Sequence, residues 1–248
     1  TRKFLPKTKI TKDEAKKMIN RLKNKGKRFK LSYDGQVLRI INLPKNYKDY
    51  PYILASFPNS YYEKKMWYTK QRTKNDKTPA QTAKILSDED KDMICAKIKK
   101  NVELRLNVDY RKTFTSKWKS DLMNTYIDTN KQKSVNAYIK AAKARKVVVS
   151  SGEVIVDPSS LWMESSGTTC YARVYVKFRV KNGNIPSAKS KYQNEVIYGS
   201  YTAIKKLPSK KSITYADEIG CDISYTNKKI TSCGVAWNFD CIADTFGK

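Results

Sequence analysis

The stretch that most constrains the fold is Thr169–Lys181, TCYARVYVKFRVK, because its side chains alternate in character with a period of two. One side of the alternation is apolar and consists of Cys170, Ala172, Val174, Val176, Phe178 and Val180. Alternation over a dozen residues predicts a long, half-buried β-strand. An apolar strand face needs a cover, so the chain must supply other elements that pack against it.

The opposite side of this predicted strand carries aromatic and cationic residues in turn: Tyr171, Arg173, Tyr175, Lys177, Arg179 and Lys181. The commoner interpretation is the solvated outer face of a sheet. The alternative is a surface that binds anions or sugars, in which the cations contact the ligand and the two Tyr residues form part of an aromatic surface. Both interpretations stay open at this point.

Helical patterns precede the strand patterns along the chain. Ser87 is placed to cap an acidic first turn, and apolar residues then recur at helical spacing as far as Val102. Shorter helices are expected over 79–86, 116–127 and 135–144. Further strands are expected over 147–149, 153–156, 195–204, 219–225 and 230–242. Helices followed by antiparallel strands predict an α+β fold in which helices cover one face of a curved sheet.

Two units are expected: a small basic α-β-β-β unit over 1–75 and a larger α+β unit over 76–248. The polar segment 69–78, TKQRTKNDKT, has no apolar anchor and is interpreted as the linker between them.

Within the first unit, Thr11-Lys-Asp-Glu14 is a capping box ahead of a helical pattern. Asp34-Gly35 is a strong hairpin signal, and a two-residue turn there places Leu31 opposite Leu38. A third strand is expected over 52–57.

The charge balance points to anionic partners. The chain has 51 Lys and Arg against 23 Asp and Glu, a formal net charge of +28, and only ten of the cations are Arg. Lys is a hydrated point charge, whereas Arg reads phosphates with a rigid fork, so this surface favours diffuse adhesion to a polyanion. Codon bias in an AT-rich genome would also enrich Lys, and that alternative stays open.

A basic and aromatic run in residues 61–72 is the densest candidate for such binding. Its cations are Lys64, Lys65, Lys70 and Arg72, and its candidate surface aromatics are Tyr61, Tyr62 and Tyr68. Interleaved cations and aromatics are typical of single-stranded nucleic-acid binding sites. Trp67 is interpreted instead as part of a core contact that joins the two units.

The sequence offers little catalytic chemistry. Histidine is absent, which excludes His-based bases and nearly all His-containing metal sites, and no glycine-rich phosphate loop is present. Glu153, Asp157 and Glu164 are candidate glycosidase carboxylates on strand and loop positions, which are also commonplace. We expect no enzymatic activity, no cofactor and no metal.

The five cysteines show no metal-binding spacing. Cys95 and Cys170 are expected to be buried thiols. Cys221, Cys233 and Cys241 cluster in the last part of the chain, where one disulfide that includes Cys221 is expected in an oxidising compartment. A two-residue turn at Asn227-Lys228 would place Cys221 opposite Gly234, a three-residue loop would place it opposite Cys233, and Cys241 competes.

Three phrases resemble one class of protein: Tyr52–Tyr62 (YILASFPNSYY), Asn107–Arg111 (NVDYR) and the strand Tyr171–Val180. They resemble secreted Gram-positive proteins with an NTF2-like (cystatin-like) domain, often attached to a copper-amine-oxidase-type stalk. The resemblance implies an extracytoplasmic binding or scaffolding role and brings no catalytic residue with it. Some unrelated proteins with NTF2-like folds use an Asp and a Tyr for proton transfer, which makes Asp109-Tyr110 a candidate pair, but a structural hydrogen bond is the commoner role for such a pair.

No window of about twenty apolar residues is present, so no membrane span is expected. The chain starts at Thr1 in a polar segment, and we expect that a signal peptide has been removed.

Together these features predict a non-enzymatic secreted or cell-surface protein that binds anionic wall polymer or a protein partner through a Lys-rich surface. The alternatives are a nucleic-acid target and an NTF2-like enzyme with a small-ligand pocket.

Overall fold

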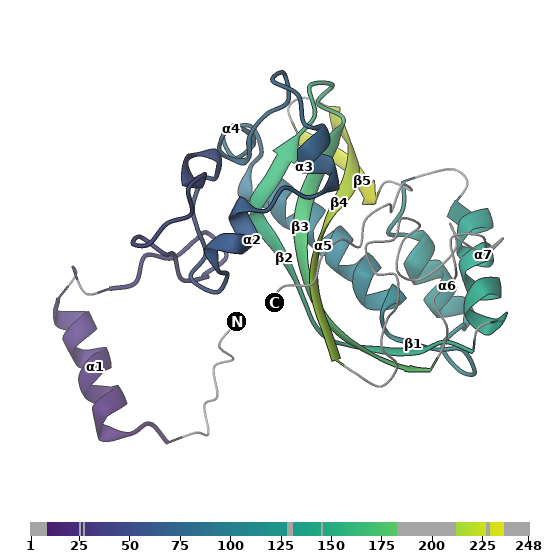
Figure 1. The fold of residues 1–248 in the computed structure, drawn as a ribbon, viewed down its shortest axis with the longest axis horizontal. Coiled ribbons are helices and arrows are strands. Elements are labelled where there is room, and N and C mark those ends of the chain that lie inside the picture. The colour runs from purple at the N-terminus through teal and green to yellow at the C-terminus, as the bar shows by residue number, and fades with distance from the viewer. Residues whose placement is uncertain are drawn as a thin grey trace.

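The computed structural model describes residues 9–24, 26, 28–127, 131–144, 146–182, 212–226 and 229–235. Within these residues the chain has an α+β fold built on a curved five-stranded antiparallel sheet in the order β1-β2-β3-β4-β5 (Figure 1). The strands are β1 (Val108–Asp109), β2 (Val148–Met163), β3 (Thr169–Asn182), β4 (Ser212–Thr226) and β5 (Lys229–Val235). The predicted α+β class is confirmed.

The alternating stretch forms β3, the central strand of the sheet, as predicted. It pairs with β2 through Val174 and Val156 and with β4 through Cys170 and Cys221. On its apolar side, Cys170, Ala172, Val174, Val176 and Phe178 are all buried. The side chain of Val180 lies outside the described part of the chain.

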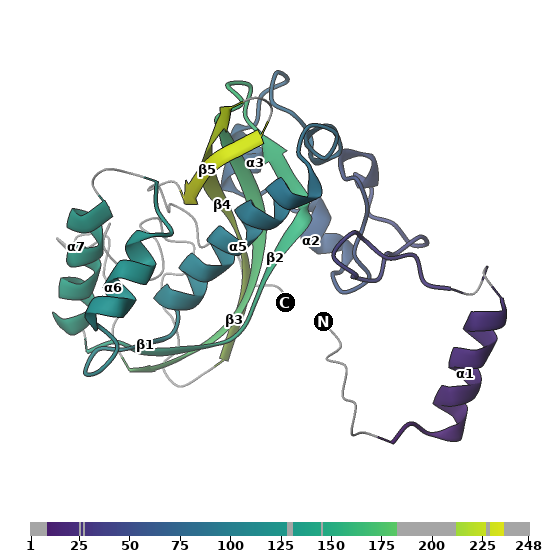
Figure 2. The same ribbon diagram turned by 180° about the vertical axis from the view of Figure 1, so that it is seen from behind.

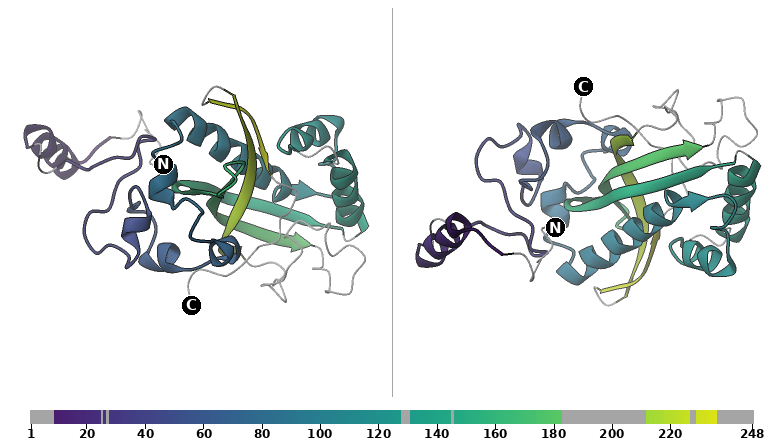
Figure 3. Two further views of the ribbon diagram at one scale, coloured as in Figure 1. Left: turned by 90° about the horizontal axis from the view of Figure 1, so that it is seen from above. Right: turned by 90° about the horizontal axis from the view of Figure 1, so that it is seen from below.

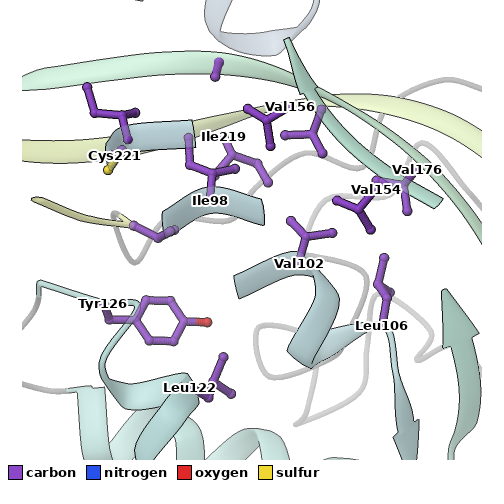
Figure 4. Packing of buried hydrophobic residues seen from close by; sticks show 14 of the residues in the cluster. Ile98, Val102, Leu106, Leu122, Tyr126, Val154, Val156, Val176, Ile219 and Cys221 are labelled. Carbon is purple, nitrogen blue, oxygen red and sulfur yellow. The ribbon is translucent and has the colours of Figure 1, made fainter. Parts of the chain in front are cut away.

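Helices cover this apolar face. α5 (Asp88–Arg105) crosses the sheet in front of the strands in Figure 2, while α6 (Ser116–Met123) and α7 (Lys131–Ala144) lie at the end of the sheet near β1. Ser87 caps α5 through the predicted hydrogen bonds. Ile98 and Val102 of α5 pack toward Val154, Val156 and Ile219 of the sheet (Figure 4). The predicted helices are confirmed, although α4 (Pro79–Thr82) and α6 are shorter than expected.

The opposite face of the sheet is also covered, which corrects the interpretation of a solvated outer face. Residues 43–66 include the 3-10 helix η2 (Tyr47–Asp49) and α2 (Asn59–Glu63), and their apolar cluster packs against Ile155 and Tyr175. In the left view of Figure 3 the sheet lies between α5 and this blue segment. Tyr171 and Arg173 are therefore buried, whereas the last third of β3 stays exposed.

The first part of the chain is less regular than predicted. The helix α1 (Lys12–Lys23) has the predicted capping box, but the expected hairpin and third strand are reduced to the isolated bridges Leu31↔Val37 and Leu38↔Leu54. Leu31 faces Val37 rather than Leu38 because the amide of Ser32 donates to the carbonyl of Gln36 (2.8 Å), which closes a three-residue turn instead of a two-residue one.

The polar segment 69–78 is anchored to the sheet, so its interpretation as a linker is wrong. It begins within α3 (Trp67–Gln71). The amide of Lys77 donates to the carbonyl of Met163 (2.8 Å), and the amide of Ser165 donates to Asp76 Oδ1 (2.8 Å). The side chain of Trp67 lies outside the described part, and the division into units 1–75 and 76–248 stays a prediction.

The strands differ from the expected ones mainly in length. The two short strands predicted over 147–156 are one strand, β2, whose register shifts beside Gly152 and again between Asp157 and Trp162. The predicted strand over 195–204 and the turn Asn227-Lys228 lie outside the described residues, as do the last residues of the strand predicted over 230–242. In the part of the chain that the structure describes, every helix is too short or too polar to cross a bilayer.

Candidate functional site

A cavity of about 400 Å³ lies where α2, η2 and α3 meet the covered face of the sheet. Five cations line it: Lys45, Lys64, Lys65, Arg72 and Arg173. Three carboxylates line it as well: Asp49, Glu63 and Glu218. Cations therefore outnumber carboxylates, and the cavity presents a net positive charge.

Arg173 of β3 forms the floor of this cavity and is 2% exposed. Its guanidinium donates to the carbonyl oxygen of Tyr61, to that of Lys64 (2.5 Å), and lies 3.5 Å from Glu218 Oε1 through Nε. A buried guanidinium is tolerated only when its charge and its donors are matched, and this one is matched by partners on two segments, residues 61–64 and β4. Arg173 therefore ties α2 and the loop after it to the sheet.

Glu218 of β4 completes the floor from the other side. It accepts a hydrogen bond from the amide of Thr69 (2.8 Å) and a second from the Thr69 hydroxyl. Arg173 and Glu218 lie directly opposite each other in the β3–β4 register. This buried ion pair holds α3 and α2 in place around the cavity without contributing much net charge to it.

The rim carries the charge that a ligand meets. Lys45 and Lys65 are exposed, and Lys64 is half-buried. Arg72 lies 3.9 Å from Asp49, so this pair is approximately neutral. Glu63 Oε1 accepts a hydrogen bond from the backbone amide of Lys45 (2.8 Å). This contact fixes the loop backbone and does not involve the ammonium group of Lys45. The ammonium groups of these lysines make the rim positively charged.

One wall of the cavity offers hydrogen-bonding groups. Trp162 is 4% exposed and stacks on Tyr171, with ring centroids 4.4 Å apart and planes at 21°. Among the described residues, Trp162 Nε1 and Asn46 Oδ1 are buried and have no hydrogen-bond partner. Buried polar atoms of this kind are rare in folded proteins, and here a ligand could supply both partners.

The carboxylate with a raised pKa lies behind this site. Burial raises the pKa of Asp157 to about 6, although hydrogen bonds from Ser159, the charge of Arg173 and the Tyr61 hydroxyl all lower it. Ser159 donates to Asp157 Oδ1 from its amide (2.9 Å) and its hydroxyl (2.6 Å). Asp157 is fully buried and does not line the cavity, so a ligand in the cavity would not contact its carboxylate.

The other candidate carboxylates are held by neighbours. Glu153 pairs with Lys177 (3.0 Å), and Glu164 accepts a hydrogen bond from the Tyr171 hydroxyl (2.5 Å). A bidentate contact with Arg111 lowers the pKa of Asp109 to about 2. Asp109 therefore has the structural role that we considered commoner, with Arg111 as its hydrogen-bond partner. A carboxylate with a lowered pKa is a poor base at neutral pH.

The structure brings some predicted site residues together and separates others. Lys64, Lys65, Arg72 and Arg173 line the same cavity, although Arg173 is buried rather than on an open surface. Lys70 is exposed on α3 beside it. The remaining cations, Lys177, Arg179 and Lys181, lie on the exposed end of β3 and do not line the cavity.

The predicted aromatic surface is largely wrong. Tyr61 and Tyr62 are 0% exposed, because Tyr61 stacks on Phe57 at 4.1 Å and Tyr62 Oη accepts a hydrogen bond from the amide of Leu54. Tyr171 is buried under Trp162 and Tyr68, while Tyr68 and Tyr175 are half-buried. Tyr61 and Tyr62 belong to the second core of the protein, the apolar cluster within residues 50–66, and Tyr175 packs against it. Rings packed in this way cannot serve as an open stacking surface.

Sequence reasoning missed Lys45, Asn46, Thr69, Trp162 and Glu218. They come from four separate segments, and their individual sequence neighbourhoods carry no motif. The available signal was a carboxylate, Glu218, directly before the strand predicted over 219–225, which could pair across the sheet with a cation such as Arg173.

The cysteine prediction fares differently for each residue. Cys95, Cys170, Cys221 and Cys233 are free thiols, so the Cys221–Cys233 bond is not formed. The register explains this, because Cys221 lies opposite Val235 and Cys233 lies opposite Ile223. Cys241 lies outside the described residues. A thiol hydrogen bond with Cys221 lowers the pKa of Cys233 to about 7. Across the described chain no cluster of Cys, Asp and Glu is arranged to hold a metal ion.

Comparisons with protein-family models, with curated proteins and with solved structures give no match to this chain.

Proposed function

We propose that this protein binds an anionic polymer, and that the cavity beneath Lys45, Lys64 and Lys65 is its main contact. The observation that carries the proposal is the cavity itself, in which a matched Arg173–Glu218 pair forms the floor and lysines form the rim. Because the floor is neutralised internally, the charge available to a ligand is that of the rim.

The shape of the site suits one anionic group of a chain. A phosphate in the cavity would accept hydrogen bonds from the ammonium groups of the rim, and buried Trp162 Nε1 is a further donor. Neighbouring groups of the same polymer would pass over Lys70, which is exposed beside the cavity. Lysine contacts of this kind select for charge density rather than for sequence.

The proposed setting is extracytoplasmic. A secreted or surface-attached protein of a Gram-positive bacterium, with an NTF2-like domain, would meet phosphate-rich wall polymer directly. A protein partner with an acidic surface is the alternative at the same rim, and the role is one of binding or scaffolding rather than catalysis.

Nucleic acid is the less supported target. Base stacking needs accessible rings, and Tyr61 and Tyr62 are fully buried in the second core. A polyanion that is recognised through charge alone has no such requirement.

The test compares two sets of charge removals of equal size. The rim variant carries Lys45→Gln, Lys64→Gln and Lys65→Gln. The control carries Lys177→Gln, Arg179→Gln and Lys181→Gln, which removes the same charge from the exposed end of β3. Binding to purified anionic wall polymer should weaken roughly tenfold in the rim variant, because each exposed pair contributes up to about 1 kcal/mol. The control should change it much less.

Salt provides the second measurement. Binding should weaken steeply as ionic strength rises, because exposed charges are screened over about 10 Å at 0.1 M. Equal losses in both triple variants would show that the cavity is not the contact. Binding that does not change with salt concentration would exclude a polyanion as the ligand.

A further inference from the structure

The first part of the chain exposes apolar side chains far more than the rest does. Among the described residues, eight of the twelve large exposed apolar side chains lie in residues 10–41. They are Ile10, Met18, Ile19, Leu22, Phe29, Leu31, Ile40 and Ile41. Single exposed apolar residues are ordinary, but a concentration of this kind marks a surface that is covered in the functional state.

The helix α1 carries the clearest part of this surface. Ala15, Met18, Ile19 and Leu22 follow the spacing of one helix face, yet Met18, Ile19 and Leu22 are 55%, 51% and 68% exposed. None of the twelve residues of α1 is buried, and the helix stands apart from the rest of the fold in Figures 1 and 2. The described part of the chain therefore provides no cover for this apolar stripe.

The charges beside the stripe indicate what covers it. At the helical angle of 100° per residue, Lys12, Lys16 and Lys23 follow one edge of the stripe and Arg21 follows the other. Residues 9–41 contain eleven Lys and Arg against three Asp and Glu. A cover that satisfies this segment must be apolar in its interior and negative at its boundary.

An anionic lipid surface has both properties. We propose that α1 lies in the interface of an anionic bilayer, with Met18, Ile19 and Leu22 inserted among the acyl chains. Lysine and arginine stems lie along the boundary and their charged ends reach the headgroups. A short helix without tertiary contacts is marginal in water, and insertion would supply the packing that α1 lacks. The apolar stripe carries this proposal, which is independent of the cavity and its polymer.

The test uses the whole chain and vesicles of phosphatidylglycerol and phosphatidylcholine in equal amounts, with phosphatidylcholine vesicles for comparison. The stripe variant carries Met18→Ser, Ile19→Ser and Leu22→Ser, which leaves every charge in place. The control carries Ile85→Ser, Met93→Ser and Ile127→Ser, which removes three exposed apolar side chains outside residues 10–41. All six positions are exposed, so both variants should fold.

In co-sedimentation, the natural chain and the control should bind anionic vesicles and should leave neutral vesicles unbound. The stripe variant should bind anionic vesicles at least about tenfold more weakly, because it lacks the three apolar side chains that would insert into the bilayer. Equal binding by the stripe variant would overturn the proposal in favour of charge alone. A lipid-free chain that sediments as a dimer, and a stripe variant that sediments as a monomer, would assign the stripe to a second copy instead.

Discussion

The two faces of β3 are buried by different means. Toward α5 the strand presents Val174 and Val176, and the covering residues are other aliphatic side chains. Toward α2 it presents Arg173, whose neighbours in the sheet are the buried carboxylates Asp157 of β2 and Glu218 of β4. The covering layer adds aromatic rings, among them Tyr61 stacked on Phe57. The first face is a hydrophobic core, whereas the second is a network of directional contacts that uses rings to exclude water.

This difference determines how each face responds to change. Apolar packing is non-directional, so the loss of one side chain removes area and leaves a cavity. A buried charge is stable only while its partners remain, and removal of one partner leaves the other uncompensated. Substitutions on the second face should therefore destabilise the protein by breaking ion pairs and hydrogen bonds. Substitutions on the first face should destabilise it in proportion to the side-chain volume that they remove.

The largest expected effect is the loss of the buried guanidinium. Arg173→Met should destabilise the protein by about 3–5 kcal/mol, because Glu218 is left as an unpaired buried charge. The double variant Arg173→Met, Glu218→Met should recover part of that loss. Denaturant unfolding of both variants measures the two free energies.

Ile98→Ala is the matched change on the helical face. It should cost about 2–4 kcal/mol through the cavity it leaves, and no second substitution at Glu218 should restore it. If Arg173→Met costs less than Ile98→Ala and the double variant gains nothing, the proposed distinction between the faces is wrong.

The second effect is a pH dependence of the free energy of unfolding that arises from Asp157, on the face of the sheet toward α2. Burial raises the pKa of Asp157 from its ordinary 3.8 to about 6, so the folded state binds this proton more tightly than the unfolded chain does. Its contribution is present at acid pH and is lost as the pH rises from about 4 to about 6. The loss amounts to about 3 kcal/mol at most.

Stability curves of the natural chain and of Asp157→Asn between pH 4 and pH 7 test this. The variant should lack the decrease, since an amide does not ionise. Parallel curves for the two proteins would mean that Asp157 ionises equally in both states.

The smallest effect compares two helix caps. Ser87 caps α5, which packs on the sheet, and Thr11 caps α1, which does not. Ser87→Ala should lower the free energy of unfolding by about 1 kcal/mol. Thr11→Ala should leave the unfolding of the sheet unchanged, because α1 contributes no buried residue. Thermal unfolding distinguishes them, and equal shifts would show that α1 packs on the fold.

The elements on the apolar side of the sheet could be predicted because their signals are local. Ser87 and the periodic residues up to Val102 define α5 within a few turns, and the alternation of 169–181 defines β3 within itself. The hairpin register was wrong because hydrogen bonds between Ser32 and Gln36 close a longer turn than Asp34-Gly35 suggests. That choice depends on side-chain contacts which dipeptide patterns do not contain.

By itself the sequence determined which residues of β3 face each way, where α1 and α5 begin, and that the chain is strongly cationic. These follow from period, capping residues and charge, all of which act over short range or over the whole surface. Only the tertiary structure decided that Arg173 is buried while Lys177 is exposed, because residues 43–66 cover one half of the face and leave the other open. Arg173 and Thr69 both contact Glu218, although the three residues lie far apart in the sequence. No local sequence pattern encodes a contact between such distant segments.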